Sequence, residues 1–155
     1  MRLTTIQSDF VERVGRWWEQ LFGSRTAGRI LAWLMICEPA YQSSQQIVDA
    51  LHTSAGSVST QTRYLEGFGL VEKVTFPTDR ATYYQFRSNA WLQMMWSEHQ
   101  RIGEMLAIAN AGEQVLPDDR PDRVLELRRM SEFLLAEWPD LMERLADYLK
   151  MENAK

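Results

Sequence analysis

The chain has 155 residues, a length that suits one compact domain or a small domain with helical extensions. Its 17 basic and 21 acidic residues give a net charge of −4, which argues against a protein that coats nucleic acid without specificity. The longest apolar run, residues 30–37, is too short for a membrane span, and the N-terminus lacks a signal-peptide pattern. The single cysteine, Cys37, excludes an internal disulfide framework. We therefore expect a cytoplasmic protein with no membrane contact.

Two helices are predicted before residue 40. The first has an apolar stripe at helical spacing and ends at Gly23; the stripe contains Phe10, Val14, Trp17, Trp18 and Leu21. Ser24 is a suitable N-cap for the second helix, which becomes apolar on nearly every side over residues 30–37. Because a helix without a polar face is normally buried, we expect this segment at the centre of the core.

A helix-turn-helix is predicted next. Ser43 is a suitable N-cap, and Gln46 three residues later completes a capping-box pattern. Thr53 or Ser54 then caps a second helix, which ends before Gly69, where a left-handed residue is needed. The inward positions of the two helices follow helical spacing: Ile47, Ala50, Leu51, Val58, Thr62, Leu65 and Phe68.

The outward face of the second helix is predicted to present polar side chains: Ser57, Ser59, Thr60, Gln61, Arg63 and Tyr64. Hydroxyls, amides and guanidinium groups meet phosphates and base edges when a helix enters a DNA major groove. Ser43 and Ser54, at the helix starts, complete the predicted contact set on these helices. The alternative is that these are ordinary solvent-facing residues, because helix-turn-helix geometry also occurs in packing units that bind no nucleic acid.

Two strands are predicted after the second helix, over residues 70–75 and 81–86. The turn-rich tip between them, residues 76–80, would make the pair a β-wing. Arg80 at this tip is placed to reach a minor groove, where negative potential favours arginine. Asp79 would either hold the Arg80 guanidinium or stabilise the turn. The order of elements predicts a winged helix-turn-helix.

Several runs in this region resemble the multiple-antibiotic-resistance-regulator (MarR) superfamily, and most of all its branch with the glycine-betaine-synthesis repressor (GbsR). The runs are Gly28-Arg29-Ile30 and those at residues 54–59, 65–71 and 79–84. Motifs cover about residues 10–86, and the remainder matches only by helical character. The resemblance implies a homodimeric transcriptional regulator, often a repressor and often released by a small ligand. Where this branch often has Lys and Asn, the chain has Ala55 and Ser57, so one phosphate contact is lost.

A long helix is predicted over residues 89–111, with an a/d seam at Leu92, Met95, His99, Ile102 and Leu106. This seam would pair with a partner chain or pack on the chain's own helices. Pro121 is predicted to begin another helix, which Trp138-Pro139 would break before a last helix. We assign residues 24–87 to a winged helix-turn-helix domain and residues 1–23 and 88–155 to a helical dimerisation region. The fold class is mainly α with a small β-wing.

Charge is distributed unevenly along the chain. Residues 41–87 carry four basic and four acidic groups, whereas residues 88–155 carry eight and thirteen. The segment predicted to contact DNA is therefore neutral. We expect few phosphate contacts per subunit and a reliance on dimerisation for affinity.

The tryptophans raise the question of an effector site. Trp17, Trp18, Trp91 and Trp96 lie on helices expected to flank the junction between the DNA-contacting and dimerising parts. Tryptophan faces attract quaternary ammonium groups, and the GbsR resemblance makes a choline-like ligand an option. Core and dimer packing is the favoured alternative, because tryptophans bury large areas.

Other sites have little support. His52 and His99 lack companions at metal-ligand spacing, and no catalytic motif is present. Cys37 has apolar neighbours, which favour a buried thiol over a redox sensor. The sequence thus predicts a non-enzymatic, homodimeric regulator of double-stranded DNA with a palindromic operator, a possible small-molecule effector, and no metal or cofactor. The alternative is a winged-helix module that binds another protein and no DNA.

Overall fold

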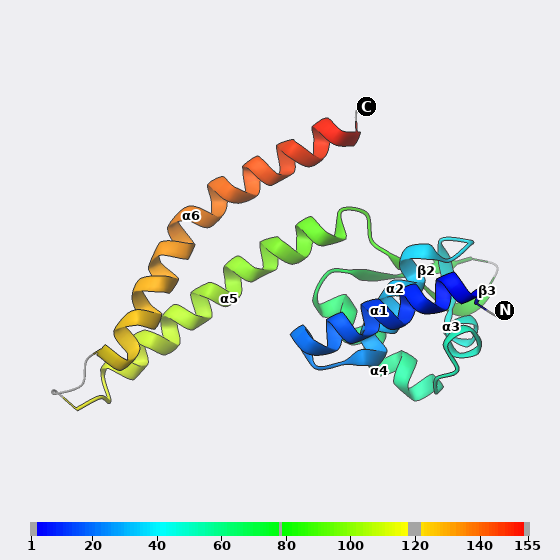
Figure 1. Ribbon diagram of the computed structural model, residues 1–155, viewed down its shortest axis with the longest axis horizontal. Coiled ribbons are helices and arrows are strands. Elements are labelled where there is room, and N and C mark those ends of the chain that lie inside the picture. The colour runs from blue at the N-terminus through cyan, green and yellow to red at the C-terminus, as the bar shows by residue number, and fades with distance from the viewer. Residues whose placement is uncertain (1–2, 78, 118–121, 154–155) are drawn as a thin grey trace. The chain divides into compact units, whose positions relative to one another are not determined.

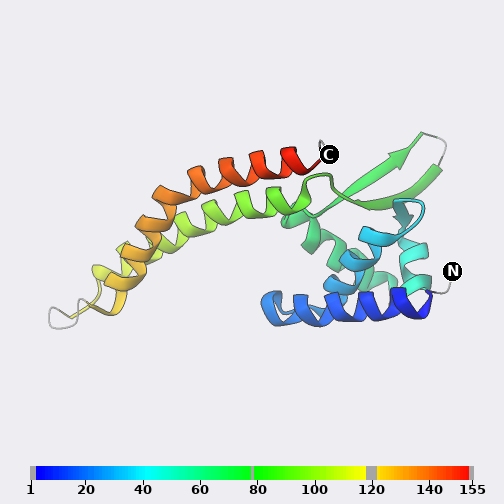
Figure 2. The ribbon, with the colours of Figure 1, turned by 45° about the horizontal axis from the view of Figure 1, so that its top comes forward.

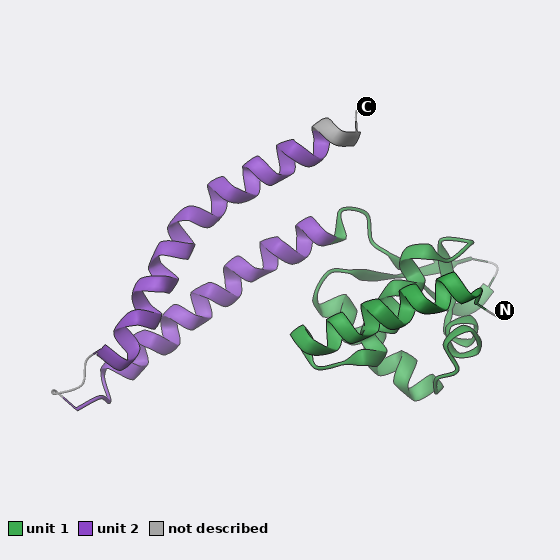
Figure 3. Ribbon diagram, in the orientation of Figure 1, with its two compact units in different colours: residues 1–90 green, residues 91–155 purple. Residues whose placement is uncertain are grey.

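The computed structural model describes residues 3–77, 79–117 and 122–153. The chain divides into two compact units, Met1–Ala90 and Trp91–Lys155 (Figure 3). Figure 1 shows the elements in order: α1 (Thr5–Phe22), α2 (Arg25–Ile36), β1 (Tyr41–Ser43), α3 (Ser44–Leu51), α4 (Ala55–Gly67), β2 (Val71–Phe76), β3 (Asp79–Phe86), α5 (Ala90–Glu113) and α6 (Asp122–Asn153). The fold is mainly helical with a small antiparallel sheet, as the sequence predicts. Within the described residues, no helix is both long enough and apolar enough to cross a membrane.

Helix α2 lies at the centre of the first unit. Residues 30–34 and Cys37 are buried, as expected for the apolar segment 30–37, but Met35 is exposed and Ile36 is only half-buried. Helix α1 crosses α2 closely at two glycines. A Cβ atom on Gly28 would lie 2.5 Å from the Cβ atom of Trp18 and 2.9 Å from the Cα atom of Gly15. The absence of side chains at both glycines is therefore what allows the two backbones to approach.

An ionic cluster joins α1, α2 and α3. The Glu12 carboxylate lies 2.6 Å from Nη2 of Arg25 and 2.8 Å from Nε of Arg29. The hydrogen bond from Arg25 and the nearby Arg29 charge hold the pKa of Glu12 below its usual value, against the opposing effect of burial. Arg29 also donates from Nη2 to the Leu51 carbonyl at 2.9 Å, which satisfies an open carbonyl at the end of α3.

The helix-turn-helix forms with the predicted caps. Ser43 Oγ accepts from the Gln46 backbone N–H at 3.2 Å, and Gln46 Oε1 accepts from the Ser43 N–H at 2.7 Å, which completes the capping box. Ser54 rather than Thr53 caps α4, accepting from the Ser57 N–H at 3.1 Å. The predicted inward set is buried: Ile47, Ala50, Leu51, Val58, Thr62, Leu65 and Phe68.

The wing is part of a three-stranded antiparallel sheet with the order β1-β3-β2. Gly69, with φ of 71°, allows the chain to turn from α4 into β2. Figure 2 shows the β2–β3 hairpin extending beyond the helices of the first unit. Strand β1 was not predicted, because three residues are too few for a periodic signal. Thr78, in the predicted tip, lies outside the described residues.

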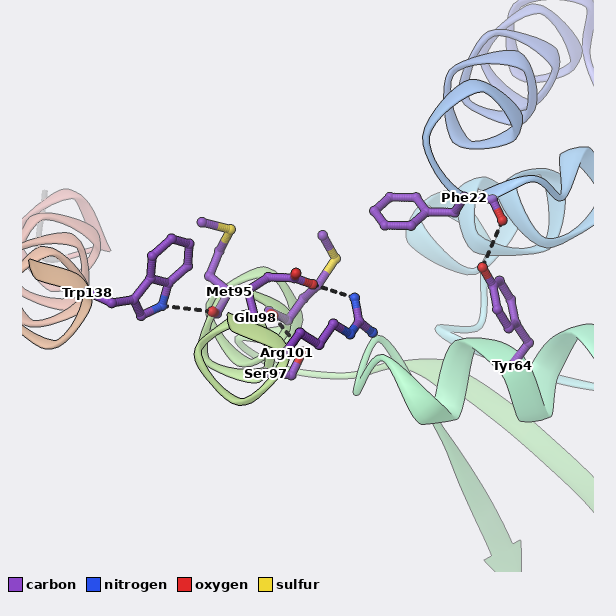
Figure 4. Close-up of polar contacts among 8 residues, drawn as sticks. Phe22, Tyr64, Met95, Ser97, Glu98, Arg101 and Trp138 are labelled. Atoms are coloured by element: carbon purple, nitrogen blue, oxygen red, sulfur yellow. Dashed lines mark hydrogen bonds and ion pairs between the residues drawn. The ribbon is translucent and has the colours of Figure 1, made fainter. Parts of the chain in front are cut away.

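The second unit consists of α5 and α6. The prediction that Trp138-Pro139 breaks a helix is wrong, because α6 continues from Asp122 to Asn153 with Pro139 inside it. Figure 1 shows that α6 changes direction near its middle, as expected where proline removes one N–H and its ring crowds the preceding turn. Trp138 Nε1 donates to the Met95 carbonyl of α5 at 3.1 Å and so ties the bend to the neighbouring helix (Figure 4). Pro121 lies outside the described residues.

The predicted a/d seam on α5 is only partly covered within this unit. Ile102 is buried, whereas Leu92, Met95, His99 and Leu106 remain partly accessible. Large apolar side chains are exposed on both helices, among them Ile108, Phe133, Leu141 and Tyr148. Packing between α5 and α6 therefore leaves part of the apolar surface of this unit uncovered.

The close crossing of α1 and α2 predicts a strong effect of a single methyl group. Gly28→Ala should lower the free energy of unfolding by about 1–3 kcal/mol, because the new Cβ overlaps backbone and side-chain atoms of α1. Gly56→Ala in α4 is the matched control, since its Cβ meets no atom within 4 Å, and it should leave stability unchanged or slightly raised. Urea unfolding measures both. Equal midpoints for the two variants would contradict the crossing geometry.

Burial predicts that Cys37 is unreactive. Its thiol is buried in the core, and desolvation raises its pKa to about 11. Because the thiolate is the reactive species, we expect an aromatic disulfide reagent at pH 8 to label the folded protein far more slowly than the urea-unfolded protein. Similar labelling rates in the two states would show that the thiol is accessible.

Candidate nucleic-acid interface

The exposed face of α4 carries part of the predicted contact set. Ser59, Thr60 and Arg63 are exposed, and Ser57 is half-buried beside them. Ser54 and Ser43 are the N-caps of α4 and α3, so their hydroxyl oxygens accept backbone hydrogen bonds. A hydroxyl that accepts in this way can still donate its own hydrogen. Both caps therefore remain able to donate to a phosphate oxygen near a helix N-terminus, where the positive end of the dipole attracts anions.

Gln61 and Tyr64 do not point outward as the sequence analysis proposed. Gln61 Oε1 accepts a hydrogen bond from Ser24 Oγ at 2.7 Å, and Tyr64 Oη donates to the Phe22 carbonyl at 2.9 Å (Figure 4). The Tyr64 ring packs edge-on against Phe68, with centroids 5.0 Å apart. Both side chains thus face the connection between α1 and α2. Helical spacing contained a signal for this, since both positions border the buried stripe of α4.

Arg80 stands at the exposed tip of the wing. Its neighbour Asp79 accepts from the Ala81 backbone N–H at 2.8 Å and from Tyr83 Oη at 2.6 Å. Of the two roles considered for Asp79, the structure shows that of stabilising the turn. The hydrogen bond from Tyr83 is the larger cause that lowers the pKa of Asp79, and the hydrogen bond from the Ala81 backbone is the smaller one. The hydrogen bond between Asp79 and Tyr83 also raises the pKa of Tyr83. Asp79 therefore stays ionised at neutral pH.

Two of the four basic side chains in residues 41–87 form ion pairs, and the other two do not pair with any residue that the structure describes. Lys73 Nζ lies 3.1 Å from Glu66, and Arg87 Nε lies 3.2 Å from Glu72. The remaining cations of residues 41–87 are Arg63 and Arg80, and neither forms an ion pair with any residue that the structure describes. A segment with no net charge can therefore still present two guanidinium groups, one on α4 and one on the wing.

The four tryptophans of the suggested effector site differ in accessibility. Trp18 is fully buried, with its ring centroid 4.3 Å from Phe22 and 5.7 Å from Phe68, so its inclusion was wrong: it has no open face for a ligand. Trp17, Trp91 and Trp96 are each exposed in part. Among the residues that the structure describes, no group of three or more His, Cys, Asp or Glu is arranged to hold a metal ion.

Comparisons with known proteins show which family the chain resembles. Residues 89–148 match the family described as "MmpR5-like MarR family transcriptional regulator". The chain is 36% identical over 126 residues to the HTH-type transcriptional regulator MmpR5 of Mycobacterium tuberculosis (strain ATCC 25618 / H37Rv), covering 81% of this chain and 76% of that protein. A crystal structure described as that of a transcriptional regulator superposes with a TM-score of 0.84 at 32% identity, over 92% of this chain and 99% of its own.

These relatives are transcriptional regulators and not enzymes. The helix-turn-helix with its wing is the part of the fold that gives such regulators access to DNA. The level of identity and the length of the match show that the chain belongs to the MarR family of transcriptional regulators, among its MmpR5-like members.

Proposed function

We propose that the protein is a homodimeric repressor that binds a palindromic operator in double-stranded DNA in the cytoplasm and is released by a small ligand. The observation that carries the DNA-binding part is that Arg63 on α4 and Arg80 on the wing have no ion pair with any residue that the structure describes. Placement in the GbsR-like branch remains a prediction, since the relatives found are described as MmpR5-like.

In this proposal α4 lies in the major groove. Arg63 contacts a base edge or phosphate, and the exposed hydroxyls of Ser59 and Thr60 contact base edges. The helix starts contact flanking phosphates through Ser43, Ser54 and Ser57. Arg80 enters the minor groove from the wing tip that Asp79 orders. Gln61 and Tyr64 are left out of this set because their side chains are bonded to the first two helices.

Exposed apolar surface supports the dimer. On α5 and α6, Ile108 is 66% exposed and Phe133 is 64% exposed. Helix α1 has a second apolar stripe beside its buried one, with Ile6, Trp17 and Leu21 exposed. Surfaces of this kind are uncommon on monomers and mark contacts with other chains. A two-fold dimer buries the same patch twice and presents two copies of α4 to successive turns of DNA.

The ligand response is proposed to act through the dimer. A ligand that binds one dimer geometry more tightly shifts the population toward it and changes the separation of the two α4 helices. Trp17, Trp91 and Trp96 offer partly exposed aromatic faces to a cationic or apolar ligand.

Selection from random duplex DNA with the purified full chain tests the proposed function. We expect recovery of an inverted repeat whose half-sites lie about one helical turn apart, roughly 10–11 base pairs. Recovery of no sequence at low salt, where electrostatic binding is strongest, would falsify the proposal and favour the protein-binding alternative.

Arg80→Ala should weaken operator binding by about 1–2 kcal/mol, because it removes one good groove contact. Lys73→Ala is the matched control: it removes the same charge from the wing, but Lys73 is paired with Glu66. Fluorescence anisotropy with labelled operator measures both affinities. An equal loss in the two variants would mean that overall charge, and not a specific contact of Arg80, determines the affinity.

A further inference from the structure

The inner face of α4 is attached to the α1–α2 turn, residues 22–24. Tyr64 Oη donates to the Phe22 carbonyl at 2.9 Å, and Gln61 Oε1 accepts from Ser24 Oγ at 2.7 Å (Figure 4 shows the first contact). The two partners are 42 and 37 residues away in sequence, so these are tertiary contacts and not local helix interactions.

Both contacts use groups that the helix ends leave open. Phe22 is the last residue of α1, and the final carbonyls of a helix have no partner within it. Ser24 is the N-cap of α2, where its oxygen accepts from the Ala27 N–H at 3.2 Å and its hydroxyl hydrogen is directed to Gln61. The structure thus uses the capping groups of the turn to hold α4.

Aromatic packing makes the same attachment rigid. Phe22 lies 5.2 Å from Phe68 by ring centroids, and Phe68 lies 5.0 Å from Tyr64. Trp18 packs on both Phe22 and Phe68 and is fully buried. Gln61 and Tyr64 are about one helical turn apart on α4, so two contacts of this spacing fix its tilt as well as its rotation.

We propose that Tyr64 and Gln61 are positioning residues that fix α4 relative to α1 and thereby set the half-site separation that the dimer accepts. This inference rests on the proposed function, in which the exposed stripe of α1 belongs to the dimer interface. A displacement of α1 in the dimer is transmitted through the turn to α4. Arg63, adjacent to Tyr64 in sequence and exposed, moves with the helix.

The test uses the selected operator and a series in which the half-site separation is changed by one or two base pairs. The variant is Tyr64→Phe, which removes the hydroxyl but keeps the ring that packs on Phe68. We expect binding to the best operator to weaken about three- to tenfold, the range that one neutral hydrogen bond supports. We expect little change on the altered operators, so the preference for one separation flattens.

Tyr84→Phe is the matched control, because Tyr84 is buried and its hydroxyl has no hydrogen bond to any residue the structure describes. It should keep the wild-type spacing profile. Gln61→Met, which removes the accepting oxygen at similar length, should reproduce the flattening independently, and serves if Tyr64→Phe does not fold.

Three results would overturn the inference. An unchanged profile in both variants would show that neither contact positions α4. A uniform loss across all separations would show direct DNA contact or general destabilisation. Greater weakening on the altered operators than on the best one would show that the contacts broaden the range of accepted separations and do not narrow it. If selection yields no operator at all, the proposed function fails first, which is a distinguishable outcome.

Discussion

The close crossing of α1 and α2 is the contact on which the first unit depends. Gly15 and Gly28 allow the two backbones to meet, and Trp18 fills the space beside them. Both helices of the helix-turn-helix are attached to this pair. Arg29 of α2 caps α3 at the Leu51 carbonyl, and the α1–α2 turn holds α4. A change at the crossing is therefore expected to shift α3 and α4, although neither helix takes part in the crossing.

Charge pairing limits the DNA contacts that residues 41–87 could make in the proposed binding mode. Lys73 and Arg87 are paired with carboxylates, so in the proposed binding mode general attraction to phosphate is weak and the contacts depend on where Arg63 and Arg80 are held. Phosphate contacts dominate affinity and base contacts give specificity, so a segment in which the described residues leave two cations without an ion pair would favour specificity over affinity. In the proposed homodimer, two copies acting together would compensate for weak binding by each one.

Features determined by neighbouring residues could be predicted from the sequence, whereas those determined by distant partners could not. The capping box of Ser43 and Gln46 and the buried stripe of α4 are local patterns, and both are confirmed. The direction of the Tyr64 hydroxyl depends on a carbonyl 42 residues away, and local spacing alone did not predict this hydrogen bond. Pro139 has its usual local effect, a bend, but α6 does not end there. The hydrogen bond from Trp138 to the Met95 carbonyl of α5 lies beside this bend, and it joins residues that are far apart in sequence.

The wing must keep a fixed position relative to α4 if Arg63 and Arg80 are to contact one DNA site together. The ion pair between Lys73 and Glu66 links β2 to α4, but half of the Lys73 side chain is exposed, and such pairs contribute little. Burial of Leu65, Leu70 and Val71 where α4 turns into β2 has a larger effect, because each side chain removes its apolar surface from water. The hydrophobic core, and not surface charge, therefore fixes the position of Arg80 on the wing relative to Arg63 on α4.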